Sequence, residues 1–478
     1  MAEGSGADRW VARGAALFLL VFGLLPIANW IPGGHDAPWY RLVLTGWISG
    51  TAIVAGAGVV LVIFSRRLPL WRPGLWGRCA AHYAERPAAV TAVVAAIAFV
   101  VYALVARFVL GGHPLLIDEI IESYQALLYA GGHLSAPLPA HPEFWSAIHL
   151  IDFPDKVYSQ FPAGGPAVLA LGLLLGVPWI TGPLAAAGSV LLFGLCLRRL
   201  ESAPGTALAA LLLFALAPFT VFMAGSMMNH VPTLLGLLAG SAGLAAMLLE
   251  PRARLGAGFL CGLGFGVAAA IRPPDAVAFA LPAAIWLLAG IRGRRVGVGA
   301  LAAAVVGFLL PVGGLLYVNW MTTGAPLRFG YEVLWGPSHA LGFHAAPWGV
   351  RHTPARGLEL INLYLLRLNT YLFEWPIPSL LPAALALWWA RELKPFDRYL
   401  LGAGAAVLGL YFAYWHDGFY LGPRFVYVLL PVATLWTARF LPTLRARFGE
   451  GERVRGAAYA LGAAVVIGLV VGLPERTA

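Results

Sequence analysis

Three carboxylates stand close together in a chain that is otherwise strongly apolar. Asp118, Glu119 and Glu122 lie in the segment GGHPLLIDEIIESYQALLYAGGHL, residues 111–134, directly after a long apolar run. Carboxylates beside hydrocarbon are costly, so acids in such a place are functional candidates. One of them can accept a proton from a hydroxyl group while its neighbour holds an acceptor or fixes a loop. Adjacent helical residues point about 100° apart, so Asp118 and Glu119 cannot be the facing carboxylates of a glycosidase without a bend between them.

The same segment also has a structural interpretation. The acids of DEIIES place negative charge at a helix N-terminus, and IIESYQALLYAGG is amphipathic and ends at a Gly-Gly pair. We expect both interpretations to hold. The sequence then predicts a capped helix at the membrane surface, with acids at the end that faces a cavity.

Three cations are candidates for binding an anion near these acids. They are Arg424 in LGPRF, Arg272 in IRPPD and Lys156 in FPDKVYSQFPAGG. Each alone is explained as an interface anchor or as the partner of a nearby aspartate. Convergence of these cations with two acids would create a site that binds a phosphate and deprotonates a hydroxyl beside it.

Composition indicates the elements that must position these side chains. The chain has 478 residues, of which 60% are hydrophobic and 11% charged, whereas soluble proteins carry roughly 25% charged residues. Apolar runs of the ~20 residues needed to cross a bilayer recur along the whole chain. We therefore predict an all-α polytopic membrane protein, a single integral membrane domain over residues 1–478. Basic loops on the cytoplasmic side explain the net charge of +10 without nucleic acid.

The positive-inside bias orients the chain. Arg9 and Arg13 place the N-terminus in the cytoplasm, and residues 1–87 form two extra helices and a basic cytoplasmic loop. The loop at 112–160 contains Lys156 as its single basic residue and is therefore expected outside.

The second half of the chain is oriented in the same way. Basic loops at 250–254, 291–295 and 391–398 are expected inside, which places a second outer segment at 321–376. Within it, residues 358–375 are too polar to span a bilayer and are expected to lie along the interface. The two halves agree if one run between 161 and 197 is re-entrant, which gives about 13 crossings. Residues 442–478 then form a cytoplasmic loop and the last helix.

Residues 88–441 resemble the core of the GT-C superfamily of glycosyltransferases. A transmembrane helix, an acidic DE at the start of the first large outer loop and the helix ESYQALLYAGGHL are similar to a signature of protein O-mannosyltransferases and lipid A aminoarabinose transferases. VYSQFPAGGPAVLALGLLLG, FMAGSMMNHVPTLLGLLAG and HDGFYLGPRFVYVLLPVATL resemble later segments of that superfamily. The sequence departs from it in having two helices before the motif helix and no sizeable C-terminal soluble domain.

The resemblance implies a reaction, its partners and a place. A sugar would move from a polyprenyl-phosphate-linked donor to a hydroxyl acceptor (lipid, glycan or protein) by a single inverting displacement. The active site would face the periplasm or exterior of a bacterial inner membrane. The residues do not require a cofactor, and a divalent metal held by Glu143 and His230 stays open because their spacing carries no metal signature.

The resemblance also implies roles for the candidate residues. Asp118 is the general base, and Glu119 orients the acceptor or a loop. Arg424 is the first candidate for binding the donor phosphate, followed by Arg272 and Lys156. Weaker candidates for contacts to the sugar or phosphate complete the set: Tyr158, Asn229, His230, His416 and Asp417.

Two other classes of protein remain as alternatives. A secondary transporter or lipid-linked-glycan flippase would explain the helices, but transporters place polar residues near mid-membrane in repeated halves. An O-antigen ligase or polymerase shares the lipid-linked donor, but its catalytic loop is expected late in the chain. The acidic loop at 112–160 comes early, which favours the transferase.

Overall fold

The computed structural model describes residues 6–32, 38–65, 73–250, 255–292 and 296–472. The predicted inner loops at 66–72, 251–254 and 293–295 lie outside this part of the chain. Nearly all of the regular structure is helical, as predicted. The helices are α1 Gly6–Leu24, α2 Ile27–Trp30, α3 Pro38–Ser65, α4 Pro73–Glu85, α5 Pro87–Leu104, α6 Ile117–Ala130, α7 Gly164–Leu174, α8 Thr181–Leu200, α9 Pro204–Leu216, α10 Pro218–Gly225, α11 His230–Leu249, α12 Leu255–Ile271, α13 Pro273–Arg292, α14 Val298–Thr323, α15 Gly330–Trp335, α16 Pro354–Tyr371, α17 Leu381–Trp389, α18 Pro395–Phe412, α19 Leu430–Ala438, α20 Phe440–Phe448 and α21 Glu452–Ile467.

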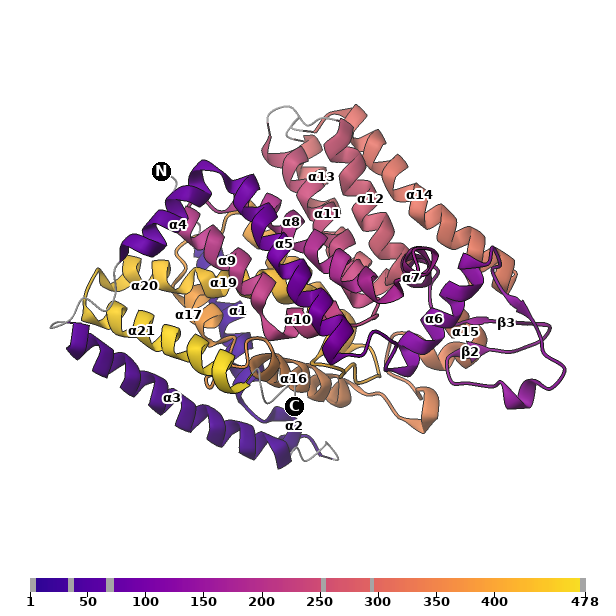
Figure 1. Cartoon of the computed structure of the whole chain (residues 1–478), viewed down its shortest axis with the longest axis horizontal. Helices are drawn as coiled ribbons and strands as arrows, with labels where there is room; N and C mark the ends of the chain where they lie inside the picture. Colours follow the sequence, from indigo (N-terminus) through magenta and orange to yellow (C-terminus); the bar gives the residue numbers. More distant parts are fainter. Residues whose placement is uncertain (1–5, 33–37, 66–72, 251–254, 293–295, 473–478) are drawn as a thin grey trace.

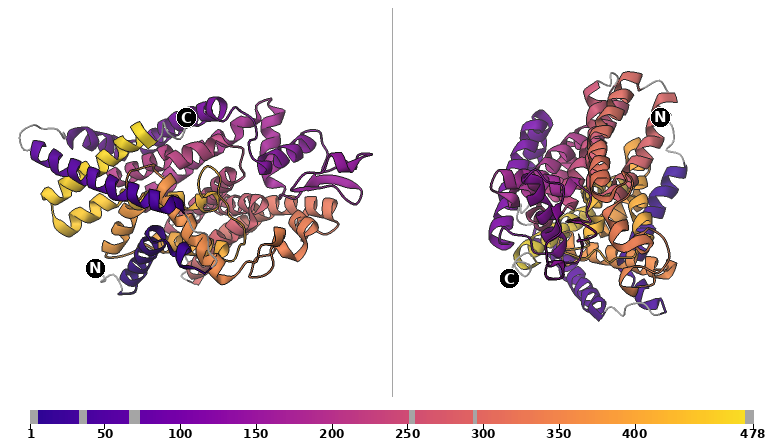
Figure 2. Two further views of the ribbon diagram at one scale, coloured as in Figure 1. Left: turned by 90° about the horizontal axis from the view of Figure 1, so that it is seen from below. Right: turned by 90° about the vertical axis from the view of Figure 1, so that its right-hand side faces the viewer.

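Shorter turns and one small sheet complete the structure. Proline at the first helical position starts α5, α9, α10 and α18, where its missing N–H is not needed. Strands β1 Ala136–Pro137, β2 Leu150–Ile151 and β3 Lys156–Ser159 form an antiparallel sheet in the order β1–β3–β2. With α15, this sheet projects at one end of the molecule (Figures 1 and 2). The 3₁₀ and π turns are η1 Val105–Val109, η2 Pro142–Phe144, η3 Pro178–Ile180, η4 Gly336–His339, η5 Pro347–Gly349, η6 Arg424–Leu429 and η7 Gly468–Gly472.

Eight helices of the described residues are long and apolar enough to span a bilayer, and the pair α9–α10, bent by 46°, makes up to nine. The predicted class of polytopic helical membrane protein is therefore confirmed, but the predicted number of about 13 crossings is not. Apolar helices α7 and α12 are shorter than 18 residues. Length and composition alone consequently do not qualify them as spans.

Small residues bring α11, α12 and α14 into close contact, and these helices lie side by side (Figure 1). A Cβ atom on Gly264 of α12 would lie 2.2 Å from the Gly240 nitrogen of α11, and one on Gly262 would lie 1.7 Å from the Ala304 oxygen of α14. Only glycine fits at such approaches, as in other membrane helix pairs. The three helices therefore pack tightly, with α12 in contact with both α11 and α14.

Residues 358–375, expected to lie along the interface, fall largely within α16 Pro354–Tyr371, and the polar residues of this helix bind the protein. Asn362 donates to the carbonyl oxygens of Phe22 (2.7 Å) and Leu25 (2.8 Å) and accepts from the amide of Ala28 (2.8 Å). Asn369 donates to the Gly23 carbonyl oxygen at 2.8 Å. The polarity of this segment thus satisfies backbone groups at the end of α1 and in α2, where α16 packs.

Candidate active site

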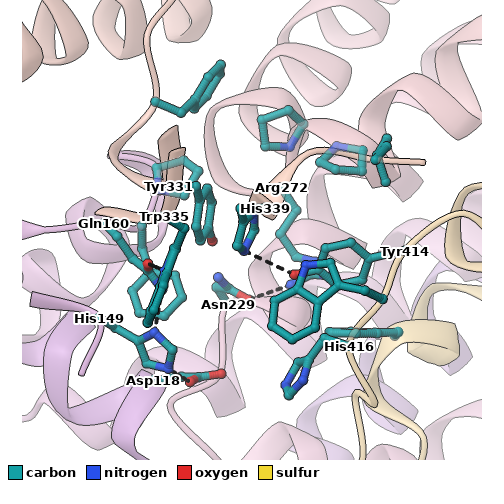
Figure 3. A pocket seen from close by; sticks show the side chains of 18 of the residues that line it. Asp118, His149, Gln160, Asn229, Arg272, Tyr331, Trp335, His339, Tyr414 and His416 are labelled. Atoms are coloured by element: carbon teal, nitrogen blue, oxygen red, sulfur yellow. Dashed lines mark hydrogen bonds and ion pairs between the residues drawn. The ribbon is translucent and has the colours of Figure 1, made fainter. Parts of the chain in front are cut away.

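A cavity of about 590 Å³ lies where six parts of the chain meet. These parts are the start of α6, the residues after β3, the start of α11, the α12–α13 junction, α15 with η4, and the segment from the end of α18 to η6. Single residues directly before β2 and in η5 complete the lining. Figure 3 shows polar and aromatic side chains from these parts pointing toward one another. The polar and charged lining residues are Asp118, Glu122, His149, Gln160, Asn229, His230, Arg272, Tyr331, Glu332, Trp335, His339, Trp348, Tyr411, Tyr414, Trp415, His416 and Arg424.

Asp118 lies in the first turn of α6 and lines the cavity. Its Oδ2 atom is 2.9 Å from Nη1 of Arg424, and its Oδ1 atom is 3.5 Å from Nε2 of His149. The Asp118 side chain is 17% exposed, so it is within reach of a molecule in the cavity. The predicted base and the first-ranked phosphate cation are therefore in direct contact.

Glu119 points away from the cavity and binds backbone. Its Oε2 atom accepts from the amides of Leu115 (2.7 Å) and Leu116 (3.2 Å), and its Oε1 atom accepts from the amide of Met227 (3.1 Å). Burial raises the pKa of Glu119, and these three amides oppose that shift. Of the two roles expected for Glu119, the geometry matches the fixing of a loop: it caps α6 and ties it to the segment before α11.

Glu122, one turn further along α6, is the third acid and lines the cavity. Its Oε1 atom accepts from Nδ2 of Asn229 at 2.7 Å, and its Oε2 atom has no hydrogen-bond partner among the described residues. Burial, and then the neighbouring charge of Asp118, raise the pKa of Glu122 well above its usual range. The protonated form is thereby favoured, although the nearby charge of Arg272 opposes the shift.

Arg272 has its guanidinium largely occupied by the protein. Nε pairs with Oδ2 of Asp275 at 2.5 Å, and Nη2 donates to the Tyr411 hydroxyl at 2.7 Å. Nη1 is 3.4 Å from Oδ1 of Asn229. Tyr411 in turn donates to Oδ1 of Asp275 at 2.7 Å, which closes the network. Arg272 therefore places positive charge beside the cavity but has few free donors.

Arg424 at the start of η6 differs from Arg272 in this respect. The residue is 5% exposed, and its Nε and Nη1 atoms have no well-aligned hydrogen bond within the described chain. The Nη1 contact with Asp118 is an ion pair by distance only. The guanidinium carbon lies 5.5 Å from the ring centre of Phe425, close enough for a cation–π contact. Its buried, underused donors make Arg424 the stronger anion-binding candidate, in the order predicted.

His230 and His416 also line the cavity. His230 begins α11, is 2% exposed and stacks on Phe425 with ring centres 6.0 Å apart. Neither ring nitrogen of His230 has a partner in the described structure. Burial, followed by the charge of Arg424, lowers the pKa of His416 to about 4. Such a histidine is neutral at physiological pH, so it can accept a hydrogen bond from a ligand as well as donate one.

Besides Glu119, three predicted site residues are not among those lining the cavity. Nζ of Lys156 donates to the Met321 carbonyl oxygen at 3.2 Å. Tyr158 is 4% exposed on β3, and Asp417 binds Nη1 of Arg367 through both carboxylate oxygens, at 2.7 and 2.9 Å. The structure therefore brings together Asp118, Arg424, Arg272, Asn229, His230 and His416, and leaves Lys156, Tyr158 and Asp417 outside.

Glu143 and His230, the pair considered for a metal, lie in different environments. Glu143 lies in the exposed η2 turn, where it contacts His141 at 3.2 Å, whereas His230 is buried at the cavity. Among the described residues, no group of three or more His, Cys, Asp or Glu side chains has the arrangement of a metal site.

Sequence reasoning did not single out His149, Gln160, Trp335 and His339, which line the cavity. Tyr331 stacks on His339 with ring centres 4.5 Å apart, and burial, with His416 and then His149 nearby, lowers the pKa of His339 to about 4. The sequence does contain a signal for part of the aromatic lining of the cavity. Residues 411–425, YFAYWHDGFYLGPRF, are dense in aromatic residues. No local pattern marks His149 or Gln160.

Comparison with known proteins identifies the class of fold. No protein-family model and no curated protein sequence matches the chain, but solved structures do, and the chain has a GT-C-like fold, as the sequence resemblance predicted. ArnT from Cupriavidus metallidurans, solved bound to undecaprenyl phosphate, is similar with a TM-score of 0.52 and 17% identity over 79% of this chain and 63% of that chain. The oligosaccharyltransferase AglB from Archaeoglobus fulgidus, in complex with an inhibitory peptide and a dolichol-phosphate, has a TM-score of 0.41 and 12% identity over 83% of this chain and 56% of that one. The chain thus spans less than two thirds of the length of both structures.

Proposed function

We propose that this protein is a GT-C-type glycosyltransferase that moves a sugar from a polyprenyl-phosphate-linked donor to a hydroxyl acceptor, with Asp118 as the base and Arg424 as the main phosphate ligand. The observation that carries the proposal is the direct contact of Asp118 with Arg424 at the wall of a 590 Å³ cavity. A carboxylate and an underused guanidinium in one cavity provide a proton acceptor and an anion site a few ångströms apart.

The reaction is a single displacement. The acceptor oxygen attacks the anomeric carbon, its proton passes to Asp118, and the bond from that carbon to the phosphate oxygen breaks with its electron pair leaving on the lipid phosphate. Arg424 stabilises the charge that develops on that oxygen, for which a planar guanidinium is well suited. Attack opposite the leaving group inverts the configuration of the anomeric carbon.

The other cavity residues have supporting parts in this proposal. Arg272 adds positive charge to the part of the cavity next to Asn229, which its Nη1 atom contacts. Its bonds to Asp275 and Tyr411 hold the guanidinium in place. His230 and Asn229 contact the sugar or the phosphate, since a buried imidazole without partners in the described structure needs a ligand to satisfy it. Lys156, Tyr158 and Asp417 receive no role in the reaction.

The similarity in fold to ArnT, which was solved with undecaprenyl phosphate, supports the choice of donor lipid. The predicted orientation places the cavity on the non-cytoplasmic face of a bacterial inner membrane, with the N-terminus in the cytoplasm. The aromatic lining, which includes Trp348 and Trp415, suits the apolar faces of sugar rings. The acceptor is a hydroxyl-bearing lipid, glycan or protein that enters this cavity.

The test is transfer from a panel of polyprenyl-phosphate sugars by purified wild type, Asp118→Asn and Glu143→Gln. Glu143 is a matched control because it is an exposed acid of the same loop. We expect Asp118→Asn to lose about 10²–10⁴-fold in turnover, with folding and donor binding retained and Glu143→Gln active. Normal turnover by Asp118→Asn would refute the mechanism. A wild type that neither binds nor uses such lipids would favour the transporter or flippase.

A further inference from the structure

Four side chains form a continuous series of polar contacts along one wall of the cavity (Figure 3). Trp335 Nε1 donates to Gln160 Oε1 at 2.6 Å, and Gln160 Nε2 lies 2.6 Å from His149 Nδ1. His149 Nε2 lies 3.5 Å from Asp118 Oδ1. The series starts on α15, passes through the residue after β3 and the residue before β2, and ends on α6. It therefore connects the second predicted outer segment to the candidate base.

The direction of every proton in this series follows from its first member. An indole nitrogen is a donor only, so Gln160 must present its oxygen to Trp335 and its NH₂ group to His149. Nδ1 of His149 then accepts, and in the neutral ring the proton is carried by Nε2, which faces Asp118. A flipped amide would set two donors against each other at Trp335. The last contact, at 3.5 Å, is long for a hydrogen bond, as is common in catalytic sites before a substrate binds.

Backbone geometry holds the series in this arrangement. His149 has φ +71°, in the left-handed region that non-glycine residues seldom adopt and that often marks functional sites. Its ring packs against Phe161 at 5.6 Å and Trp335 at 6.4 Å between ring centres. A Cβ atom on Gly330 would lie 2.6 Å from the Gln160 Cα atom, so glycine is what lets α15 approach Gln160.

We propose that His149, Gln160 and Trp335 are positioning residues that fix the tautomer of His149 and thereby aim the carboxylate of Asp118 at the acceptor. This inference rests on the proposed role of Asp118 as the base. In the resting site Arg424 contacts the other oxygen of Asp118. Once a phosphate engages Arg424, the Nε2–H group of His149 is the contact that keeps the carboxylate oriented.

Gln160→Glu tests the direction of the series with almost no change of shape. A carboxylate only accepts, so His149 must carry a proton on Nδ1. At low pH the ring then holds two protons; as pH rises it loses the one on Nε2 and turns a lone pair toward Asp118. The groups that face His149 and bear on this titration are Asp118 of α6, Arg424 of η6, His339 of η4 and His416. We expect a pH profile of turnover with a new alkaline loss of about 10-fold to 100-fold.

Nitrogen-15 spectra of histidine-labelled protein provide a second readout, with the His149 signals assigned by their loss in His149→Asn, a residue that tolerates positive φ. Wild type should show a protonated Nε2 and a bare Nδ1, and Gln160→Glu a protonated Nδ1. Trp335→Phe removes the donor that starts the series and should lower kcat by up to about tenfold with the donor KM unchanged. The control is Trp320→Phe, since Trp320 is 56% exposed on α14.

Two results would overturn the proposal. One is a Gln160→Glu variant whose histidine spectrum and pH profile match those of wild type. The other is a wild-type His149 protonated on Nδ1. A wild type that transfers no sugar would refute the proposed function, and with it the role of the series in catalysis, whereas the spectra would still report whether the tautomer is fixed.

Discussion

Asp118→Asn is expected to move donor binding and turnover in opposite directions. In the resting site the carboxylate contacts the guanidinium of Arg424 at 2.9 Å, and the two side chains are only 17% and 6% exposed. A phosphate entering the cavity must therefore compete with Asp118 for Arg424. Asparagine keeps the shape of the side chain but removes the charge, so this competition disappears.

The magnitude follows from the contact that is lost. Interactions with charged hydrogen-bonding groups contribute about 1.5–3 kcal/mol. In wild type, a phosphate that binds Arg424 must break the Asp118–Arg424 contact, and we take this loss as ~2 kcal/mol. The variant does not have this loss, so it should bind phosphate about 30-fold more tightly, because a tenfold change in affinity corresponds to about 1.4 kcal/mol. Turnover loses its proton acceptor at the same time, which costs about 10²–10⁴-fold.

The assay is equilibrium binding of undecaprenyl phosphate to protein in lipid nanodiscs, with single-turnover transfer measured on the same samples. Glu143→Gln again serves as the control, because it removes one acid from the same loop without touching the cavity. Tighter binding with slower transfer is the expected pair of results. Equal or weaker binding by Asp118→Asn would show that phosphate does not compete with Asp118 for Arg424, and the reasoning would be wrong.

Three further predictions concern buried polar groups. Glu119→Ala removes the acceptor of three backbone amides and should lower the free energy of unfolding by about 1–3 kcal/mol, measured by denaturation in detergent; an unchanged midpoint would contradict the capping role. Glu122 has a raised pKa, so the folded state retains a proton that the unfolded state releases, and stability falls as pH rises from the unfolded pKa of about 4.3 toward the folded one. Glu122→Gln should flatten this dependence in melting curves taken across pH, and an equal slope in both proteins would refute it. Asn362→Leu takes the Asn362 partner from the Ala28 amide and the Phe22 carbonyl oxygen, and removes one of two donors to the Leu25 carbonyl oxygen. The change should cost about 2–3 kcal/mol, visible as a lower melting temperature that Leu358→Ala, on the exposed side of α16, does not reproduce.

Much of the architecture could be predicted because local patterns determine it. The acidic start and Gly-Gly end of 117–132 predicted α6, whose bounds are Ile117–Ala130. Arg424 could be ranked first among the cations through the resemblance of HDGFYLGPRFVYVLLPVATL to a late segment of the GT-C superfamily. The polarity of residues 358–375 distinguishes them from the spanning runs, whereas the burial of Asn362 could not be predicted, because its partners lie more than 300 residues earlier.

The remainder of the site depends on contacts between distant segments. Lys156 and Arg424 are both predicted to lie outside the membrane, but Lys156, the first residue of β3, donates to the Met321 carbonyl oxygen and does not line the cavity. His149 lies 3.5 Å from Asp118 and has a backbone with positive φ, which no sequence pattern signals. Trp335 lies 175 residues from the Gln160 side chain that it fixes. No spacing or composition records such pairings, since each depends on how whole helices pack.

The bonds between α1 and α16 have a consequence for how the chain is made. Asn369 donates to the carbonyl oxygen of Gly23, a residue that leaves the ribosome 346 positions earlier. At the usual rate of synthesis of about 5–20 residues per second, the end of α1 waits roughly 17–70 s for this partner. During that interval its backbone groups must be satisfied by water, lipid headgroups or an insertion factor. Helix α1 is thus synthesised well before α16, with which it makes this contact.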